Sequence, residues 1–83
     1  MTHVRMWEAR CEPGRTDETV EWVQLHVVAS ALESGAGSAE VFRSEDRVVL
    51  LTRWSSATTW VEPAPDAGLV ARCHAWPFER VDG

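Results

Sequence analysis

The chain has 83 residues, 45% of them hydrophobic and 25% charged, which excludes a second independently folded domain and a disordered chain. Its formal net charge of −5 repels phosphate backbones and anionic lipids, so nucleic acid is not an expected partner. Because no apolar run reaches the about 20 residues of a membrane span and the first residues lack a signal-peptide core, we expect one cytoplasmic domain over residues 1–83 with no membrane partner.

The first third of the chain predicts a strand followed by a helix. The strand covers residues 4–11 and ends at the turn residues Pro13-Gly14. The helix covers residues 17–34, because acidic side chains occupy its first turn and valines recur at helical spacing. Gln24 falls inside the apolar stripe that should face a sheet. A buried amide needs a partner, which is Thr52, the backbone or water, or else the polar group of a ligand.

A β-hairpin is predicted next, with strands at residues 38–43 and 47–54 on either side of a polar turn. Its second strand contains the uninterrupted apolar run 48–51, so both faces of this strand should be covered. The hairpin therefore belongs to a sheet that is shielded on two sides.

The last third predicts a second, broken helix and a final strand. Ser55-Ser56 is a candidate helix cap, but two prolines limit the first helical piece to about two turns. Asp66 restarts the helix as far as Arg72. The final strand covers residues 75–81 and contains Pro77, which suits the edge of a sheet.

These elements give the order β-α-β-β-α-β, which is the ferredoxin-like α+β plan with a four-stranded antiparallel sheet. Right-handed crossovers place both helices on one face of the sheet. The other face holds Val49 and Leu51 and is uncovered in a monomer, so we expect a homodimer that buries on the order of 2,000 Å². Arg53 shares this face and should pair with an acid across the dimer. The candidate acids are Glu8, Glu40 and Glu79.

Several residue types that enzymes commonly use do not occur. Lys, Asn, Tyr and Ile are absent, a pattern typical of a high-GC bacterium because their codons are rich in A and T. Schiff-base and P-loop lysines, tyrosine acid–base chemistry and an asparagine oxyanion donor are therefore excluded. Cys11 and Cys73 form no C-x-x-C pair, and the histidines and cysteines have no characteristic ligand spacing. We expect reduced thiols, no metal and no cofactor.

Three segments resemble the antibiotic biosynthesis monooxygenase family: Pro13-Gly14, residues 37–43 and residues 48–55. The resemblance covers about residues 4–61, and its most specific element is a tryptophan that closes the third strand after a mostly apolar run. It implies a dimeric α+β barrel. Family members include cofactor-independent quinone-forming oxygenases of polyketide pathways, haem-degrading relatives and many small proteins without established chemistry.

The resemblance also implies roles for particular residues. Trp54 corresponds to the family's third-strand tryptophan, which faces the cleft between sheet and helices, and Thr52 and Leu50 share that face. Trp7 stands where the oxygenases and haem-degrading relatives tend to place asparagine, and an indole offers one donor while filling the space. Haem is not expected, because residues 55–72 contain no histidine that would ligate iron.

Trp7 and Trp54 are therefore candidate walls of an aromatic pocket, or else core residues. Arg5 is a candidate catalytic residue that binds a phenolate or carboxylate at the cleft mouth, or else it closes a surface ion pair. His74 is the candidate base at the cleft edge.

Three classes of function stay open. The first is a cofactor-free monooxygenase-like enzyme that acts on an aromatic polyketide or similar hydrophobic intermediate, with a cyclase or isomerase as its variant. The second is a non-catalytic dimer that binds a hydrophobic small molecule or a protein. The third is an ACT-like regulatory domain, which shares the order of elements and often has Pro-Gly at the first turn.

Overall fold

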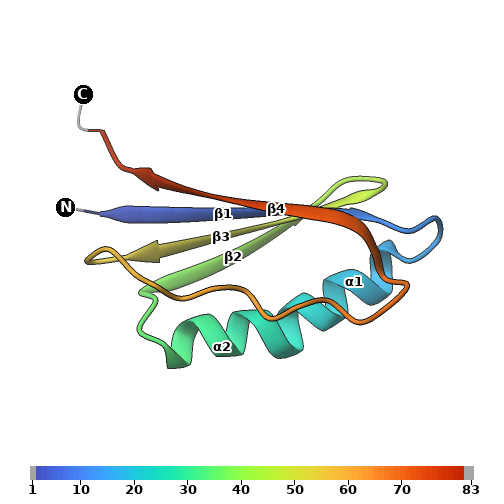
Figure 1. Ribbon diagram of the computed structural model, residues 1–83, viewed down its shortest axis with the longest axis horizontal. Helices are drawn as coiled ribbons and strands as arrows, with labels where there is room; N and C mark the ends of the chain where they lie inside the picture. Colours follow the sequence, from blue (N-terminus) through green and yellow to red (C-terminus); the bar gives the residue numbers. More distant parts are fainter. Residues whose placement is uncertain (1, 82–83) are drawn as a thin grey trace.

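The computed structural model describes residues 2–81 and shows a four-stranded antiparallel sheet with one long helix on one of its faces (Figure 1). The strands are β1 (His3–Cys11), β2 (Ser38–Arg43), β3 (Arg47–Trp54) and β4 (Val70–Glu79). Their spatial order is β2-β3-β1-β4. The strand that contains Pro77 therefore lies at an edge, as predicted, while β1 and β3 are central.

The helix is continuous over residues 16–33 but is not a uniform α-helix. It consists of α1 (Thr16–Trp22), the π-helical turn η1 (Val23–Val27) and α2 (Val28–Glu33). Its fully buried side chains recur at every fourth position, namely Thr19, Val23, Val27 and Ala31. In an ideal α-helix each such step rotates the stripe by about 40°. The wider π turn takes up part of this rotation and keeps the stripe on the sheet.

This π turn overturns the prediction that Gln24 lies in the buried stripe. Gln24 is exposed, and Leu32, which a uniform helix would also turn inward, is 48% exposed. A helical wheel drawn at 100° per residue cannot anticipate a local change of pitch. None of the helices within residues 2–81 combines the length and apolar character that crossing a membrane requires.

The predicted second helix is also wrong, because residues 55–69 form a loop and Val70 already belongs to β4. Pro63 and Pro65 lack N–H donors and disfavour helical geometry at the residues that precede them. The Trp60 amide donates to Thr58 Oγ1 at 3.0 Å, a local bond that competes with helical hydrogen bonding. The predicted second piece of this helix, from Asp66 to Arg72, is also absent, because Leu69 and Val70 lead into strand β4 instead.

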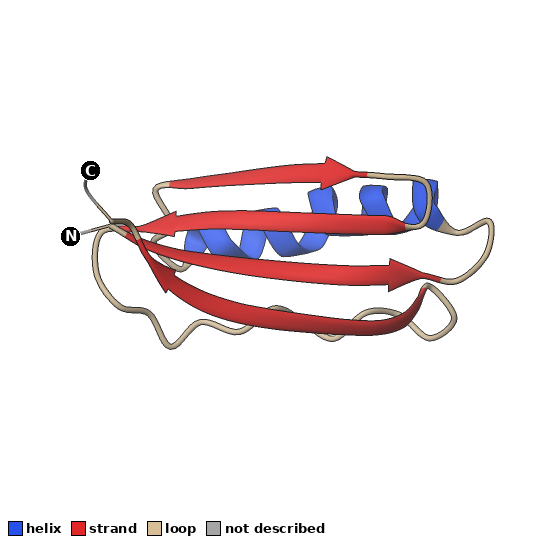
Figure 2. Cartoon of the chain, turned by 90° about the horizontal axis from the view of Figure 1, so that it is seen from above, coloured by secondary structure: helices blue, strands red, loops and turns tan. Residues whose placement is uncertain are grey.

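Loop 55–69 occupies the place of the missing helix. Figure 2 shows the helix behind one half of the sheet and the loop behind the half that contains β4. Figure 1 shows that both lie on the same side of the sheet. The sheet is therefore covered on one face by a layer that is half helix and half loop.

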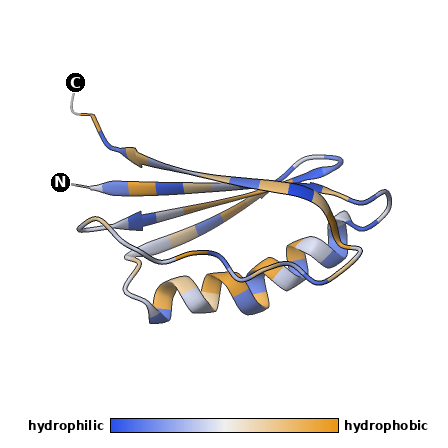
Figure 3. Ribbon diagram, viewed as in Figure 1, coloured by the Kyte–Doolittle hydropathy of each residue, from blue (hydrophilic) through white to orange (hydrophobic). Residues whose placement is uncertain are grey.

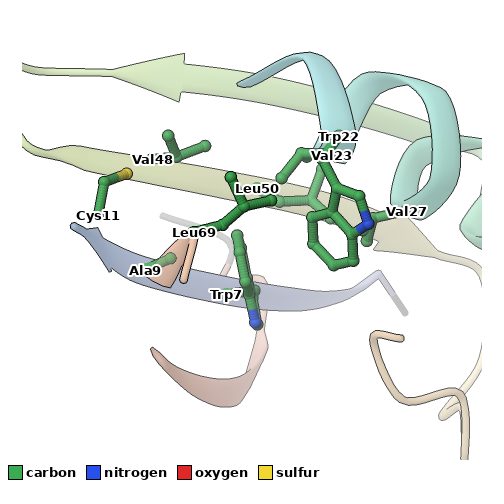
Figure 4. Packing of buried hydrophobic residues seen from close by; sticks show 9 residues of the cluster. All are labelled: Trp7, Ala9, Cys11, Trp22, Val23, Val27, Val48, Leu50 and Leu69. Atoms are coloured by element: carbon green, nitrogen blue, oxygen red, sulfur yellow. The ribbon is translucent and has the colours of Figure 1, made fainter. Parts of the chain in front are cut away.

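The core lies between the sheet and this layer. Trp7 and Leu50 are cross-strand partners on β1 and β3, and both are nearly inaccessible to solvent. They pack with Val23 and Val27 of the helix and with Leu69 at the end of the loop (Figure 4). Hydrophobic residues of the helix line its length (Figure 3), so burial against the sheet is the main force that holds it there.

The other face of the sheet is uncovered in one chain, as predicted. The smallest dimension of the molecule is 16 Å, which corresponds to two layers. Leu51 and Met6 are neighbours on this open face and are half-buried. Three large side chains stand more exposed beside them, Phe42 at 51%, Trp76 at 41% and Phe78 at 50%.

Arg53 lies on the open face, as its parity predicts, but it pairs within the chain. Its guanidinium contacts the carboxylate of Glu40 on β2, a diagonal cross-strand neighbour. The expectation that Arg53 requires an acid from a second copy is therefore wrong. Both side chains are nearly half exposed, so the pair is a surface contact of small energetic weight.

Candidate functional site

A cavity of about 300 Å³ lies where β1 begins and where β3 and β4 end. Trp54, the last residue of β3, lines it together with Arg5 from β1 and Pro77 from β4. Ala57 and Thr58 of the loop close its remaining side. This volume is at the lower end of the range found for small-molecule pockets.

The Trp54 indole is fixed in place by its neighbours. Its Nε1–H donates to Thr52 Oγ1 at 2.9 Å, and the Thr52 hydroxyl donates to the Arg5 carbonyl at 3.4 Å. Thr52 and Arg5 are direct partners across β3 and β1, so the sheet register sets this chain of contacts. Trp54 and Thr52 are 5% and 1% exposed, so only a small part of the fixed indole is accessible where Trp54 borders the cavity.

The loop adds a second indole against the first. The ring centroids of Trp54 and Trp60 lie 5.6 Å apart, within the range of aromatic pairs, and the rings are tilted by 36° to each other. Trp60 Nε1–H donates to Ser30 Oγ on α2 at 3.1 Å. Trp60 therefore connects the loop both to the end of β3 and to the helix.

An ion pair fixes the loop to the centre of the sheet. Arg5 donates to both oxygens of the Glu62 carboxylate, from Nε at 2.7 Å and from Nη2 at 2.8 Å. The Arg5 and Glu62 side chains are only 20% and 5% exposed. The hydrogen bonds that Arg5 donates to Glu62 raise the pKa of the Arg5 guanidinium and outweigh the opposing effect of desolvation, so this residue stays cationic. Of the two roles predicted for Arg5, the structure shows the ion pair.

A second cavity, of about 320 Å³, lies on the other side of this ion pair. Arg5 and Glu62 both line it, with Trp7 from β1 and the loop residues Pro63 and Pro65. Arg5 therefore borders both cavities. Glu62 borders only the second cavity, so Arg5 is the residue that the two cavities share.

The structure brings most of the predicted ligand-binding residues to this side of the sheet. Trp7, Leu50, Thr52 and Trp54 all point toward the helix and loop, and all are buried. Trp7 and Leu50 are core residues, and Trp7 also borders the second cavity. Gln24 is not part of the group, because it lies on the exposed side of the helix.

His74 is separated from Arg5 by the sheet. It is the β4 partner of Glu8, whereas Arg5 is the partner of Pro77, and side chains alternate between the two faces of a strand. His74 therefore lies on the open face, with its ring 5.7 Å from that of Trp76. Arg5 and His74, the two predicted catalytic residues, both border the second cavity, but their side chains point to opposite faces of the sheet.

Trp60 and Glu62 were not among the candidates, because the sequence assigned them to a helix. A usable signal was present, since a residue before proline favours an extended backbone and Glu62 precedes Pro63. In an extended segment, residues two apart point the same way. That reasoning would have placed the indole and the carboxylate on one side of the loop.

Other features of the described chain offer less to a ligand. A larger hollow of about 630 Å³ lies at the opposite end of the sheet, bordered mainly by turn residues and charged side chains. Cys11 is buried and Cys73 exposed, and both are free thiols. No three His, Cys, Asp or Glu side chains within residues 2–81 are arranged to hold a metal ion. The cavities around Arg5 are therefore the candidate site.

Comparison with family models, with curated proteins and with solved structures found no match to the chain. A function for the chain is therefore argued from its own geometry. The relevant features are the buried indole of Trp54, the cation of Arg5 and the loop that covers both.

Proposed function

We propose that the chain binds a hydrophobic aromatic small molecule on the helix side of its sheet, between Trp54 and loop 55–69. The observation that carries this proposal is the fixed Trp54 ring, which borders a cavity of about 300 Å³ beside a guanidinium. A rigid aromatic wall with one adjacent charge is typical of pockets that hold a planar ligand in one orientation.

A second proposal is cofactor-free oxygen chemistry at the same site, to which the resemblance to the antibiotic biosynthesis monooxygenase family points. Arg5 borders the Trp54 cavity, and a cation there would favour the deprotonated form of a phenol or enol. Catalysis is the second proposal because Arg5 is paired with Glu62 and because the His74 side chain points to the opposite face, although both residues border the second cavity. A cyclase or isomerase would use the same cavity without oxygen.

We also propose that two copies pair through their open sheet faces to form a dimeric α+β barrel. The observed strand order is the one expected for a ferredoxin-like plan, with a loop in place of the second helix. Large apolar side chains stand exposed on the open face, and exposed apolar patches of this kind mark interaction surfaces. Phe78 on this face also borders the Trp54 cavity, so this dimer interface would lie beside the candidate site.

The Trp54→Phe variant tests the binding proposal. We expect 2-naphthol, an aromatic phenol, to bind the wild-type protein and to bind Trp54→Phe about 10-fold more weakly, because a smaller ring loses contact area and stacking. Isothermal titration calorimetry measures both affinities. Oxygen uptake recorded in the same mixtures separates binding alone from oxygenase chemistry.

The matched control is Trp76→Phe, which makes the same change on the open face. This variant should bind 2-naphthol as the wild type does. Equal losses in both variants, or no binding of 2-naphthol by the wild-type protein, would show that the Trp54 cavity is not the binding site.

A further inference from the structure

The loop itself places two groups at the candidate site that a ligand could also supply, an aromatic ring and a carboxylate. Trp60 lays an aromatic ring on Trp54, and Glu62, two residues later, presents a carboxylate to Arg5 in a two-pronged contact. Val61 between them is 68% exposed and contributes little to the interior. An aromatic ring and a carboxylate, here supplied by residues two positions apart, are the chemical parts of an aryl carboxylic acid.

We propose that the site recognises an aromatic carboxylate, and that Trp60 and Glu62 occupy the site in its place until such a ligand displaces the loop. This inference rests on the proposed binding function and specifies its ligand class. The ligand carboxylate would take the position of Glu62 on Arg5, and its ring would take the position of Trp60 against Trp54.

The attachment of the loop suits such an exchange. Within residues 57–65 no backbone–backbone hydrogen bond connects the loop to the helix or to the sheet. The segment is held by side chains, chiefly through Arg5–Glu62, Trp54–Trp60 and the bond from Trp60 to Ser30. Segments with few backbone bonds open at a lower free-energy cost than core strands.

The charge of Arg5 determines which ligands can displace the loop. Removing Glu62 without replacement would leave a largely buried guanidinium unpaired, which is strongly unfavourable. An anionic ligand avoids this cost because it keeps Arg5 paired while Glu62 moves into water. A neutral ligand of the same shape does not, so the site should discriminate against it.

The volumes of the two cavities that Arg5 borders also agree with an exchange of Glu62 for a ligand. Arg5 borders a cavity of about 300 Å³ on one side and one of about 320 Å³ on the other, and loop residues form a wall of each. Displacing the segment that carries Glu62 would join these spaces. The joined space would suit a two-ring aromatic acid.

The experiment compares 2-naphthoate with its neutral analogue 2-naphthamide by isothermal titration calorimetry. We expect the wild-type protein to prefer the anion. The Glu62→Gln variant removes the competing charge while keeping the shape of the side chain, and it should bind 2-naphthoate at least 10-fold more tightly. Binding of 2-naphthamide should tighten as well, because that ligand no longer has to break the Arg5–Glu62 pair, and the preference for the anion should remain. Glu33→Gln, which makes the same charge change at an exposed position on α2, should leave both affinities unaltered.

A second variant keeps the test informative if Glu62→Gln is unstable. Arg5→Met combined with Glu62→Leu replaces the ion pair by apolar side chains, a change that folded proteins often tolerate. This double variant should lose the preference for 2-naphthoate over 2-naphthamide. Retention of the preference there, or an unchanged or weaker affinity for 2-naphthoate in Glu62→Gln, would overturn the proposal.

The binding function and the preference for a carboxylate are tested by different outcomes. If the wild-type protein binds neither 2-naphthol nor 2-naphthoate, the proposed binding function is wrong. If 2-naphthol binds at Trp54 but the Glu62 substitution leaves 2-naphthoate binding unchanged, only the carboxylate inference is wrong.

Discussion

The Leu51→Glu variant is expected to be a monomer of 9.3 kDa at micromolar concentrations at which we expect the wild-type protein to be a dimer. Leu51 lies on β3 beside Met6, in the apolar part of the open sheet face. A carboxylate buried there without a partner costs about 3 kcal/mol or more, which weakens association by at least about 100-fold. Sedimentation velocity measures the change directly.

Leu25→Glu is the matched control for this substitution. Leu25 is 62% exposed on the helix, away from the open face, so a charge there should not affect dimerisation. Thermal unfolding of both variants checks that the isolated chain still folds, since Leu51 faces solvent in a single copy. A wild-type protein that sediments as a monomer, or a Leu51→Glu variant that stays dimeric, would contradict pairing through this face.

The Trp7→Ala variant is expected to lose about 3–5 kcal/mol of unfolding free energy. Trp7 is 3% exposed and packs in the centre of the core against Leu50 and the helix, so its removal leaves a large void (Figure 4). Domains of this length have roughly 4–12 kcal/mol of stability in total. The expected loss is therefore about a quarter or more of the total stability.

Urea titration followed by circular dichroism measures this loss. The Trp7→Phe variant keeps most of the apolar surface and should lose clearly less stability than Trp7→Ala. This comparison also addresses the position at which the sequence resembles a family that tends to use asparagine. A loss below about 1 kcal/mol in Trp7→Ala would mean that the indole is not a core residue.

The hairpin and the first helix were predictable because local chemistry determines them. The strands β2 and β3 have the predicted bounds, since a polar turn separates two strand-forming segments. The helix lies within one residue of its prediction, with acidic residues in its first turn and Gly35 at φ 106° just after its end. Strand parity also placed Trp7, Thr52 and Trp54 correctly on one face.

The other features of the fold and of the candidate site depend on interactions that local sequence patterns do not encode. Gln24 lies at the surface because the helix contains the π turn η1, and no residue type in this turn indicates a change of helical pitch. Glu62 meets Arg5 across 57 positions of sequence, so the ion pair required the fold to be known. The face occupied by His74 followed from β4 beginning at Val70, where a helix was expected.

The most direct test of the proposed site uses the five tryptophans as reporters. Their indole N–H resonances are resolved in a nitrogen–proton correlation spectrum and can be assigned with single Trp→Phe variants. On addition of 2-naphthol, the account predicts shifts at Trp54 and Trp60, beneath the loop, and no shift at Trp76 on the open face. Shifts confined to Trp76, or none at all, would contradict a ligand site between the loop and the sheet.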